Sequence, residues 1–124
     1  MIYVYNRNKE SHQSHPNNFP IYRPTILGNP YTHIKDRETK AAFVVATREE
    51  AIERYSDYFD AMYSGNVKFK AAVDEIYEKY KAGEDIFLEC FCAPLKCHGD
   101  IIASKLRSRR IKELLKEKKH ENII

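Results

Sequence analysis

Apolar and polar residues follow one another in short blocks along the 124-residue chain, and two of the apolar blocks predict β-strands. Residues 2–5 are β-branched or aromatic, and the polar residues Asn6 and Arg7 come directly after them, so we expect an opening strand that ends there. Residues 86–92 carry apolar side chains at both odd and even positions. A strand of this kind is usually covered on both faces, so we expect it at the centre of a sheet.

Helical periodicity dominates the middle of the chain. Residues 47–50, Thr-Arg-Glu-Glu, match a capping box, and a stripe of apolar residues at helical spacing continues to Met62. A second apolar stripe predicts a helix that ends at Gly83, since glycine suits the left-handed conformation that often follows a helix. The run Cys-His-Gly-Asp at positions 97–100 leads into a third, long helix.

Segments rich in polar residues and proline separate these elements. We expect residues 9–20 to form a loop and residues 21–31 to form an extended piece with an ordered turn at Gly28-Asn29-Pro30. Residues 32–46 are compatible with either a helix or a short strand. The alternation of strands and helices predicts an α/β fold, a small single-domain sandwich with a short, partly parallel sheet and flanking helices.

Basic residues gather towards the end of the sequence. The whole chain has a formal net charge of +3, yet residues 101–124 alone contain eight basic and three acidic residues. We therefore divide the chain into an α/β domain, residues 1–106, and a basic C-terminal helix extension and tail, residues 107–124. Such a helix can contact nucleic acid or another polyanion, or it can be a solvated helix with acidic and basic residues paired four positions apart. Both interpretations stay open.

Composition and missing motifs exclude several classes of protein. Hydrophobic residues make up 43% and charged residues 31%, which is typical of a globular chain. The longest apolar stretches are shorter than a membrane span, and the first residues lack the basic and apolar regions of a signal peptide, so we expect a cytoplasmic protein with no membrane partner. Motifs of phosphate-binding loops, dinucleotide-binding folds and HExxH metalloproteases are missing.

The three cysteines all lie between positions 90 and 97. An odd number in so short a segment argues against a disulfide framework and for reduced thiols. If the cluster binds zinc, Cys92, Cys97 and His98 are the preferred ligands, with Cys90 as an optional fourth. The alternative is that Cys90 and Cys92 are ordinary buried side chains, as free cysteines often are.

The segment 97–100 also predicts a ligand pocket. A thiol at the start of a helix has a lowered pKa, which we expect for Cys97, and a glycine there lets an anion approach the helix N-terminus. Ligands of open α/β sheets bind outside the carboxyl ends of the strands, where the polar residues after both predicted strands would meet. We expect His98 and Asp100 to be the acid-base residues of this pocket. Its predicted ligand-binding residues are Asn6, Arg7, Arg23, Gly28, Asn29 and Gly99.

Several of these motifs together resemble one known family. They are Arg23-Pro24, Leu27-Gly28-Asn29-Pro30, Arg48-Glu49-Glu50-Ala51-Ile52 and the closing Cys90-Phe91-Cys92-Ala93-Pro94-Leu95-Lys96-Cys97-His98-Gly99-Asp100. From about residue 2 to residue 106 the chain is similar to the domain-of-unknown-function 4326 family of bacteria and phages. One difference is Tyr22, because relatives tend to have glycine before the Arg-Pro pair. The resemblance strengthens the predicted fold and site and, through the phage members, implies a role against host enzymes or host defence.

Two classes of function remain. In the first, the protein binds, or binds and hydrolyses, a phosphorylated or ribosylated nucleotide-type small molecule, with Arg7 and Arg23 neutralising phosphate and with Asn6 and Asn29 recognising polar groups. In the second, it is a non-catalytic interaction module, optionally stabilised by zinc, that docks on nucleic acid or on a host protein through its basic C-terminal helix. We favour the first.

Overall fold

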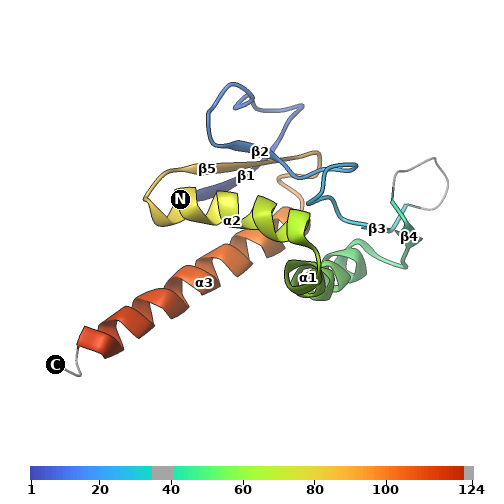
Figure 1. Cartoon of the computed structure of the whole chain (residues 1–124). Helices are drawn as coiled ribbons and strands as arrows, with labels where there is room; N and C mark the ends of the chain where they lie inside the picture. Colours follow the sequence, from blue (N-terminus) through green and yellow to red (C-terminus); the bar gives the residue numbers. More distant parts are fainter. Residues whose placement is uncertain (35–40, 122–124) are drawn as a thin grey trace.

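The computed structural model describes residues 1–34 and 41–121 (Figure 1). In chain order the elements are β1 (Ile2–Asn6), β2 (Asn18–Pro20), β3 (Tyr31–Thr32), β4 (Phe43–Val44), α1 (Arg48–Gly65), α2 (Val67–Lys81), β5 (Ile86–Cys90) and α3 (His98–Glu121). Part of the ambiguous segment 32–46 lies outside the described residues, and its described ends contribute to β3 and β4, which pair in parallel. The predicted α/β fold is confirmed.

Strand β5 is the centre of a three-stranded sheet with the order β1-β5-β2, as its apolar pattern predicts. Both neighbours run parallel to β5, with Ile2 opposite Ile86 and Asn6 opposite Cys90. The sheet is thus parallel throughout rather than in part. Because β1 and β5 point the same way, the residues that follow them lie at one edge of the sheet.

The sheet differs from the prediction in two places, one additional strand and one strand end. Strand β2 lies inside the predicted loop 9–20, because an edge strand tolerates the proline that we read as a turn signal. Strand β5 ends two residues earlier than predicted, at Cys90. There the side-chain amide of Asn6 donates hydrogen bonds to the carbonyl oxygens of Phe91 (3.0 Å) and Ala93 (3.1 Å), and these bonds hold the chain in a turn instead of a strand.

The first helix begins, and the second helix ends, where the sequence predicts. The hydroxyl of Thr47 accepts a hydrogen bond from the backbone N–H of Glu50 (3.1 Å), and the carboxylate of Glu50 accepts one from the N–H of Ala46 (3.1 Å). The side chain of Asn66 caps α2 in the same manner. After α2, Gly83 has a φ of 91°, the left-handed conformation expected of a glycine at this position.

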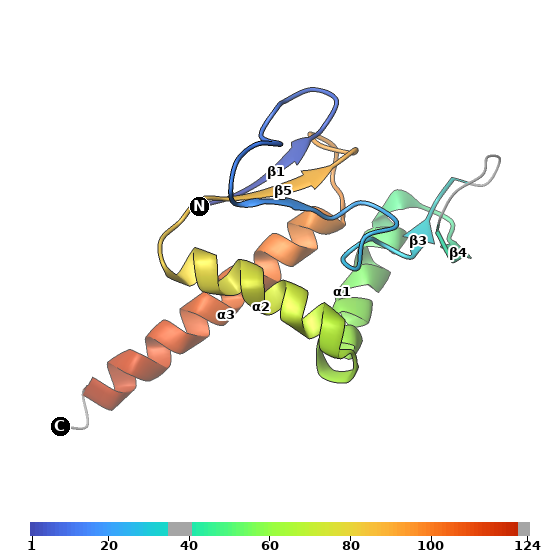
Figure 2. The same ribbon diagram turned by 45° about the horizontal axis from the view of Figure 1, so that its top comes forward.

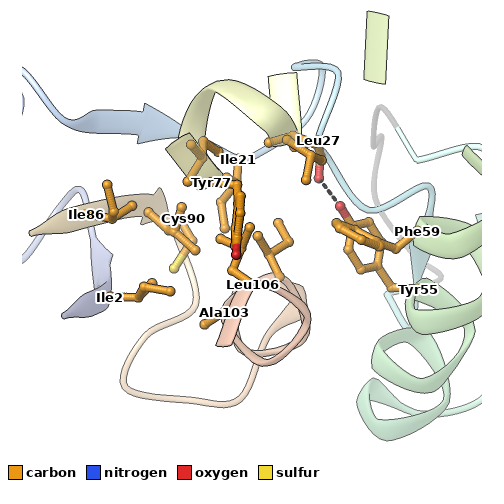
Figure 3. Close-up of a cluster of buried hydrophobic side chains, with 14 of the residues drawn as sticks. Ile2, Ile21, Leu27, Tyr55, Phe59, Tyr77, Ile86, Cys90, Ala103 and Leu106 are labelled. Atoms are coloured by element: carbon orange, nitrogen blue, oxygen red, sulfur yellow. Dashed lines mark hydrogen bonds between the residues drawn. The ribbon is translucent and has the colours of Figure 1, made fainter. Parts of the chain in front are cut away.

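Helices α2 and α3 cover one face of the sheet, and α1 crosses next to both (Figures 1 and 2). The core lies between these layers and consists of fully buried apolar side chains, among them Ile21, Ile76, Ile86, Leu88, Ile102 and Leu106 (Figure 3). Tyr55 of α1 is also fully buried, and its hydroxyl donates a hydrogen bond to the carbonyl oxygen of Leu27 (2.7 Å). This bond ties the loop after β2 to α1.

The loop between β1 and β2 packs against the other face of the sheet. The ring of His12 stacks on Phe87 of β5, with 4.3 Å between ring centroids, and the ring of His15 meets Phe87 at an angle, at 4.4 Å. His12 also contacts Tyr5 of β1 edge to face. The central strand is therefore covered on both faces, as its sequence predicts.

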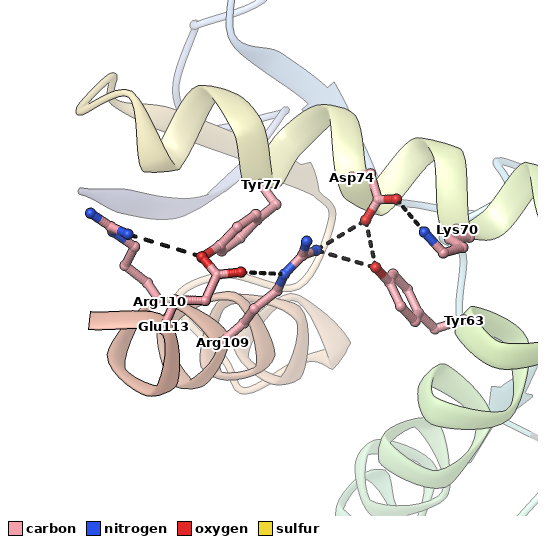
Figure 4. A network of polar contacts seen from close by, with 7 residues as sticks. All are labelled: Tyr63, Lys70, Asp74, Tyr77, Arg109, Arg110 and Glu113. Carbon is pink, nitrogen blue, oxygen red and sulfur yellow. Dashed lines mark hydrogen bonds and ion pairs between the residues drawn. The ribbon is translucent and has the colours of Figure 1, made fainter. Parts of the chain in front are cut away.

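A polar network joins all three helices (Figure 4). The carboxylate of Asp74 on α2 accepts hydrogen bonds from Tyr63 (2.6 Å), Lys70 (2.7 Å) and Arg109 (3.0 Å). Partial burial raises the pKa of Asp74, but the hydrogen bonds from Lys70, Tyr63 and Arg109 outweigh it and lower that pKa to about 2. Arg109 also pairs with Glu113 one turn further along α3, at 3.5 Å.

Helix α3 is continuous from His98 to Glu121, so the predicted boundary between residues 106 and 107 falls inside one helix. Its first part packs on the sheet, where Arg107 donates a hydrogen bond to the carbonyl oxygen of Ile2 (3.0 Å). Its last turns extend beyond the rest of the molecule (Figure 2). Within the described part of the chain, no helix has the length and apolar character needed to cross a membrane.

Candidate functional site

A cavity of about 650 Å³ opens at the carboxyl ends of β1 and β5. The last residues of these strands, Asn6 and Cys90, line it, and the N-terminal ends of α1 and α3 contribute Arg48 and His98. The loop after β2 adds Arg23. Ligands of open parallel sheets bind at this position, so the fold brings the two predicted strand ends together at a ligand-sized cavity.

Positive charge dominates the walls of this cavity, which we call the basic pocket. Lys9, Arg23, Arg48 and Lys96 line it, and among the residues that the structure describes no Asp or Glu does. Arg23 is oriented by hydrogen bonds to the carbonyl oxygens of Asn29 (3.2 Å) and Tyr31 (3.3 Å). Where the described part of the wall offers no carboxylate to neutralise them, such cations attract an anion.

Arg48 is the first residue of α1. The helix dipole disfavours a cation at this end of a helix and favours acidic residues, such as the neighbouring Glu49 and Glu50. The basic side chain is therefore not explained by helix stability. Its place in the wall of the basic pocket accounts for it.

Aromatic rings form part of the wall, and two of them are in contact with each other. Tyr22 and Phe91 lie with their ring centroids 4.8 Å apart, and Phe91 is 47% exposed although it is a large apolar side chain. Arg7 supports this pair from outside the pocket, where it donates a hydrogen bond to the Tyr22 hydroxyl (2.9 Å). An accessible ring beside cationic side chains is suited to stacking on a planar base.

The two asparagines that we predicted as ligand contacts hold the backbone of the site. Besides the bonds to Phe91 and Ala93, the Asn6 side chain accepts a hydrogen bond from the N–H of Asn8 (2.9 Å). Asn29 donates to the carbonyl oxygen of Ala51 (3.1 Å) and accepts from the N–H of Tyr31 (2.9 Å). Both side chains line the pocket, but the amide oxygen and nitrogen of each are engaged by the backbone.

The predicted glycines do not line the pocket. A Cβ atom at Gly99 would lie 2.8 Å from Cγ1 of Val4 and 2.9 Å from Cδ1 of Ile21, and a Cβ at Gly28 would lie 3.1 Å from the backbone of Arg23. The N–H of Gly99 donates to the sulfur of Cys97 (3.3 Å). Close packing, rather than the predicted approach of a ligand, explains both glycines.

The predicted acid-base residues are separated. The His98 ring is buried, donates from Nε2 to the carbonyl oxygen of Ile21 (2.6 Å) and meets the Tyr55 ring edge to face, and burial lowers its pKa to about 4. Asp100 is exposed outside the pocket, and its carboxylate accepts a hydrogen bond from the N–H of Cys97 (3.1 Å). Of the predicted site residues, Arg23, Asn29 and His98 thus meet in the wall of the pocket, whereas Asp100 lies outside it, in the first turn of α3.

All three cysteines line the basic pocket. Cys90 and Cys97 are buried, whereas Cys92 is partly exposed. Interaction with Cys90 and Cys92 raises the pKa of the Cys97 thiol, which keeps its proton. Donation of that proton to one of the two sulfurs at a time lowers the pKa values of Cys90 and Cys92 to about 7 and about 6. Cys97 caps α3 as predicted, but the predicted lowering of its own pKa is wrong, because it is the donor in this cluster.

The predicted zinc ligands Cys92, Cys97 and His98 do not form a metal site. Within residues 1–34 and 41–121, no three His, Cys, Asp or Glu side chains come together in a way that would hold a metal ion. The physical reason is that the Nε2 atom of His98 is engaged by Ile21 and the ring is packed against Tyr55.

Several residues of the pocket were not predicted as site residues. Among them are Lys9, Tyr22, Arg48, Phe91 and Lys96, and the wall also includes Tyr31, Thr32, His33, Ile34, Ala51, Ile52 and Leu95. For Arg48 the sequence does contain a signal, a basic residue directly after a helix N-cap, where acidic residues are preferred. The two lysines and two rings lie on loops or at their ends, and no local pattern distinguishes them from solvated loop residues.

The fold and the pocket define a class: a small protein with a parallel α/β sheet whose strand ends open into a basic, thiol-lined pocket. Within that class, the family described as a domain of unknown function (DUF4326) matches residues 4–108, and the chain belongs to this family, as the resemblance of its motifs implied. No curated protein and no solved structure matches the chain.

Proposed function

We propose that the protein binds a phosphorylated, nucleotide-type small molecule in the basic pocket. The observation that carries this proposal is the wall itself, which combines two arginines and two lysines with the partly buried ring of Tyr22 and the exposed ring of Phe91 and, among the described residues, has no carboxylate. A phosphate supplies the negative charge that such a wall attracts, and a base supplies the flat apolar surface that the rings can cover.

The phosphate would lie between Arg23 and Arg48, which approach the pocket from the loop after β2 and from the start of α1. Both arginines act on Cys92, whose pKa they help to lower, so their charges are felt at the same point of the pocket. Arginine is well suited to this role because its planar guanidinium can make two parallel hydrogen bonds to a phosphate.

The base would stack on Tyr22 and Phe91 at the rim of the pocket. A volume of about 650 Å³ lies within the range of about 300 to 1,000 Å³ typical of small-molecule sites, so a whole nucleotide can be enclosed. The alternative function, docking through the basic C-terminal helix, has less support. Two arginines of that helix, Arg107 and Arg109, are engaged by the protein's own backbone and side chains.

Calorimetric titration with AMP, adenosine and inorganic phosphate tests the proposal. We expect AMP to bind more tightly than either part alone, because only AMP engages both the arginines and the rings. Replacing Arg48 with Gln removes one charged partner of the phosphate and should weaken AMP binding by about tenfold or more, which corresponds to about 1.5 to 3 kcal/mol.

Lys112→Gln is the matched control, since it removes the same charge from an exposed position on α3 outside the pocket. Its AMP affinity should equal that of the wild type. If AMP, tested alongside GMP, CMP and UMP, does not bind to the wild type, or if Arg48→Gln and Lys112→Gln bind equally well, the proposal is wrong.

A further inference from the structure

We propose that Cys92 is a nucleophile that attacks anionic electrophiles bound in the basic pocket. The proposal adds a covalent step to the proposed binding function. It rests on that function only because both the binding and the covalent step use the positive charge of the same pocket. Three observations support it: where the three sulfur atoms lie, which of them is accessible, and which charged groups surround it.

The three thiols form one cluster because of the chain's path after β5. Asn6 holds the turn that follows Cys90, and the turn returns the chain to the start of α3, where Cys97 lies. Cys97 is within hydrogen-bonding reach of both Cys90 and Cys92, and its single thiol proton is donated to one of them at a time. A free cysteine that served only as a small apolar side chain would not need two further thiols as hydrogen-bond partners.

Only one of the three sulfur atoms is suited to attack. Cys90 is 1% exposed and its sulfur accepts a hydrogen bond from the N–H of Ala93 (3.4 Å). Cys97 is 4% exposed and its sulfur accepts one from the N–H of Gly99 (3.3 Å). Cys92 is partly exposed and lines the pocket, so it is the thiol that a bound molecule can reach.

The surroundings of Cys92 favour its thiolate. The Cys97 thiol donates a hydrogen bond to it, and Arg48 adds a second hydrogen bond and, together with Arg23, a positive charge. These contributions exceed the effect of burial and lower the pKa of Cys92 to about 6. At neutral pH the side chain is therefore mostly the thiolate, which is the reactive form of cysteine.

The same arginines select the substrate. They attract an electrophile that carries a negative charge close to its reactive atom, and they lie next to the sulfur that attacks it. In this step the Cys92 thiolate gives its electron pair to the electrophilic atom, a bond forms between Sγ and that atom, and the bond to the leaving group breaks. The leaving group departs with the electrons of the broken bond, Cys97 retains its proton, and no oxidant or reductant is required.

Alkylation by iodoacetate and iodoacetamide tests this inference without knowledge of the natural substrate. In both reactions a carbon–sulfur bond forms and iodide leaves, but only iodoacetate is an anion. The rate of each reaction is followed by intact-protein mass spectrometry between pH 5 and pH 9, and peptide mapping identifies the modified cysteine. Glutathione, treated in parallel, gives the ratio of the two rates for an unassisted thiol.

We expect the first equivalent of either reagent to modify Cys92, at a rate that stops rising above about pH 7, whereas the rate of an ordinary thiol, with a pKa of about 8.5, is still rising at about pH 9. The ratio of the iodoacetate rate to the iodoacetamide rate should exceed that of glutathione by about threefold to tenfold. Arg48→Gln should bring the ratio towards that of glutathione, and Lys112→Gln should leave it unchanged. Cys92→Ser should abolish the fast modification.

If Cys90 or Cys97 is modified first, if the rate at Cys92 keeps rising to pH 8.5, or if the ratio equals that of glutathione, Cys92 is not the nucleophile we propose. These outcomes are separate from the calorimetric result. A protein that binds AMP but has an ordinary Cys92 retains the proposed function and loses this inference. A protein that binds no nucleotide but has an anion-selective, fast Cys92 retains this inference and loses the proposed function.

Discussion

Replacing Gly99 with Ala distinguishes the two explanations of this glycine, close packing and ligand approach. Gly99 is the second residue of α3, and its Cα faces β1 and the residue after β2. The new methyl group would lie 2.8 Å from Cγ1 of Val4, 2.9 Å from Cδ1 of Ile21 and 3.2 Å from the sulfur of Cys97. Carbon atoms in contact prefer a separation of about 3.5 to 4.0 Å, so the helix start or its neighbours must move.

The loss of stability follows from which neighbour can move. Cδ1 of Ile21 is the end of a side chain and can rotate, but Val4 is branched at Cβ and has little rotational freedom. Overpacking of this kind destabilises a protein by about 1 to 3 kcal/mol. Alanine offsets up to about 1 kcal/mol of this loss because it favours the helix more than glycine does. We therefore expect Gly99→Ala to lower the free energy of unfolding by about 1 to 2 kcal/mol.

Urea unfolding followed by circular dichroism measures this difference, and thermal unfolding should show a midpoint lower by roughly 3 to 10 °C. Gly65→Ala is the matched control. Gly65 is the last residue of α1, and a Cβ there would have no atom within 4 Å, so the same substitution should leave stability unchanged or raise it by up to about 1 kcal/mol.

Two results would refute the packing explanation. If Gly99→Ala is as stable as Gly65→Ala, the contacts with Val4 and Ile21 do not limit the space at this position. If Gly99→Ala keeps the stability of the wild type but loses AMP binding, the glycine is needed for the approach of a ligand, as the sequence first indicated.

Two further predictions concern pH. His98 has a pKa lowered to about 4 by burial against an unfolded value of about 6.5, so the unfolded state binds more protons between these values and the protein should lose on the order of 3 kcal/mol as the pH falls from 6.5 to 4. His98→Gln should flatten this part of the pH profile in urea unfolding, and an unchanged profile would exclude His98 as its cause. Asp74 has a pKa lowered to about 2, so its stabilisation is complete above about pH 4 and is lost as the pH falls towards 2. Asp74→Asn should destabilise the protein by about 1 to 2 kcal/mol at pH 7 and remove the loss below pH 4, and equal stability of the two proteins at pH 7 would show that the helix network is dispensable.

The helices and the central strand could be predicted because their signals are local. The capping residue Thr47, the apolar stripes and Gly83 are each read from a few adjacent residues, and the structure uses them as predicted. Strand β2 could not be predicted, because a three-residue edge strand exists only through its pairing with β5. Such pairing depends on residues about 70 positions further along the chain.

The place of the site could be predicted better than the roles of its residues. Parallel strands guarantee that the residues after β1 and β5 meet, and they do. The sequence does not say whether a polar side chain there will face a ligand or a backbone carbonyl. Asn6, Asn29 and His98 have the residue types expected of ligand contacts, yet each is engaged by the backbone, whereas Arg48 and Cys92 face the pocket.

The strand order β1-β5-β2 also determines when the site can form. Strands β1 and β2 are adjacent along the sequence, but each pairs with β5, so the sheet cannot assemble until residues 86–90 are available. During synthesis, a ribosome-bound chain that has not yet exposed β5 has two unpaired strands and no pocket. The cysteines follow directly in and after β5, so the reactive thiol emerges together with the strand that encloses it. Sheet pairing between such distant segments is a slow step, and we expect the appearance of fast Cys92 alkylation to report the end of folding.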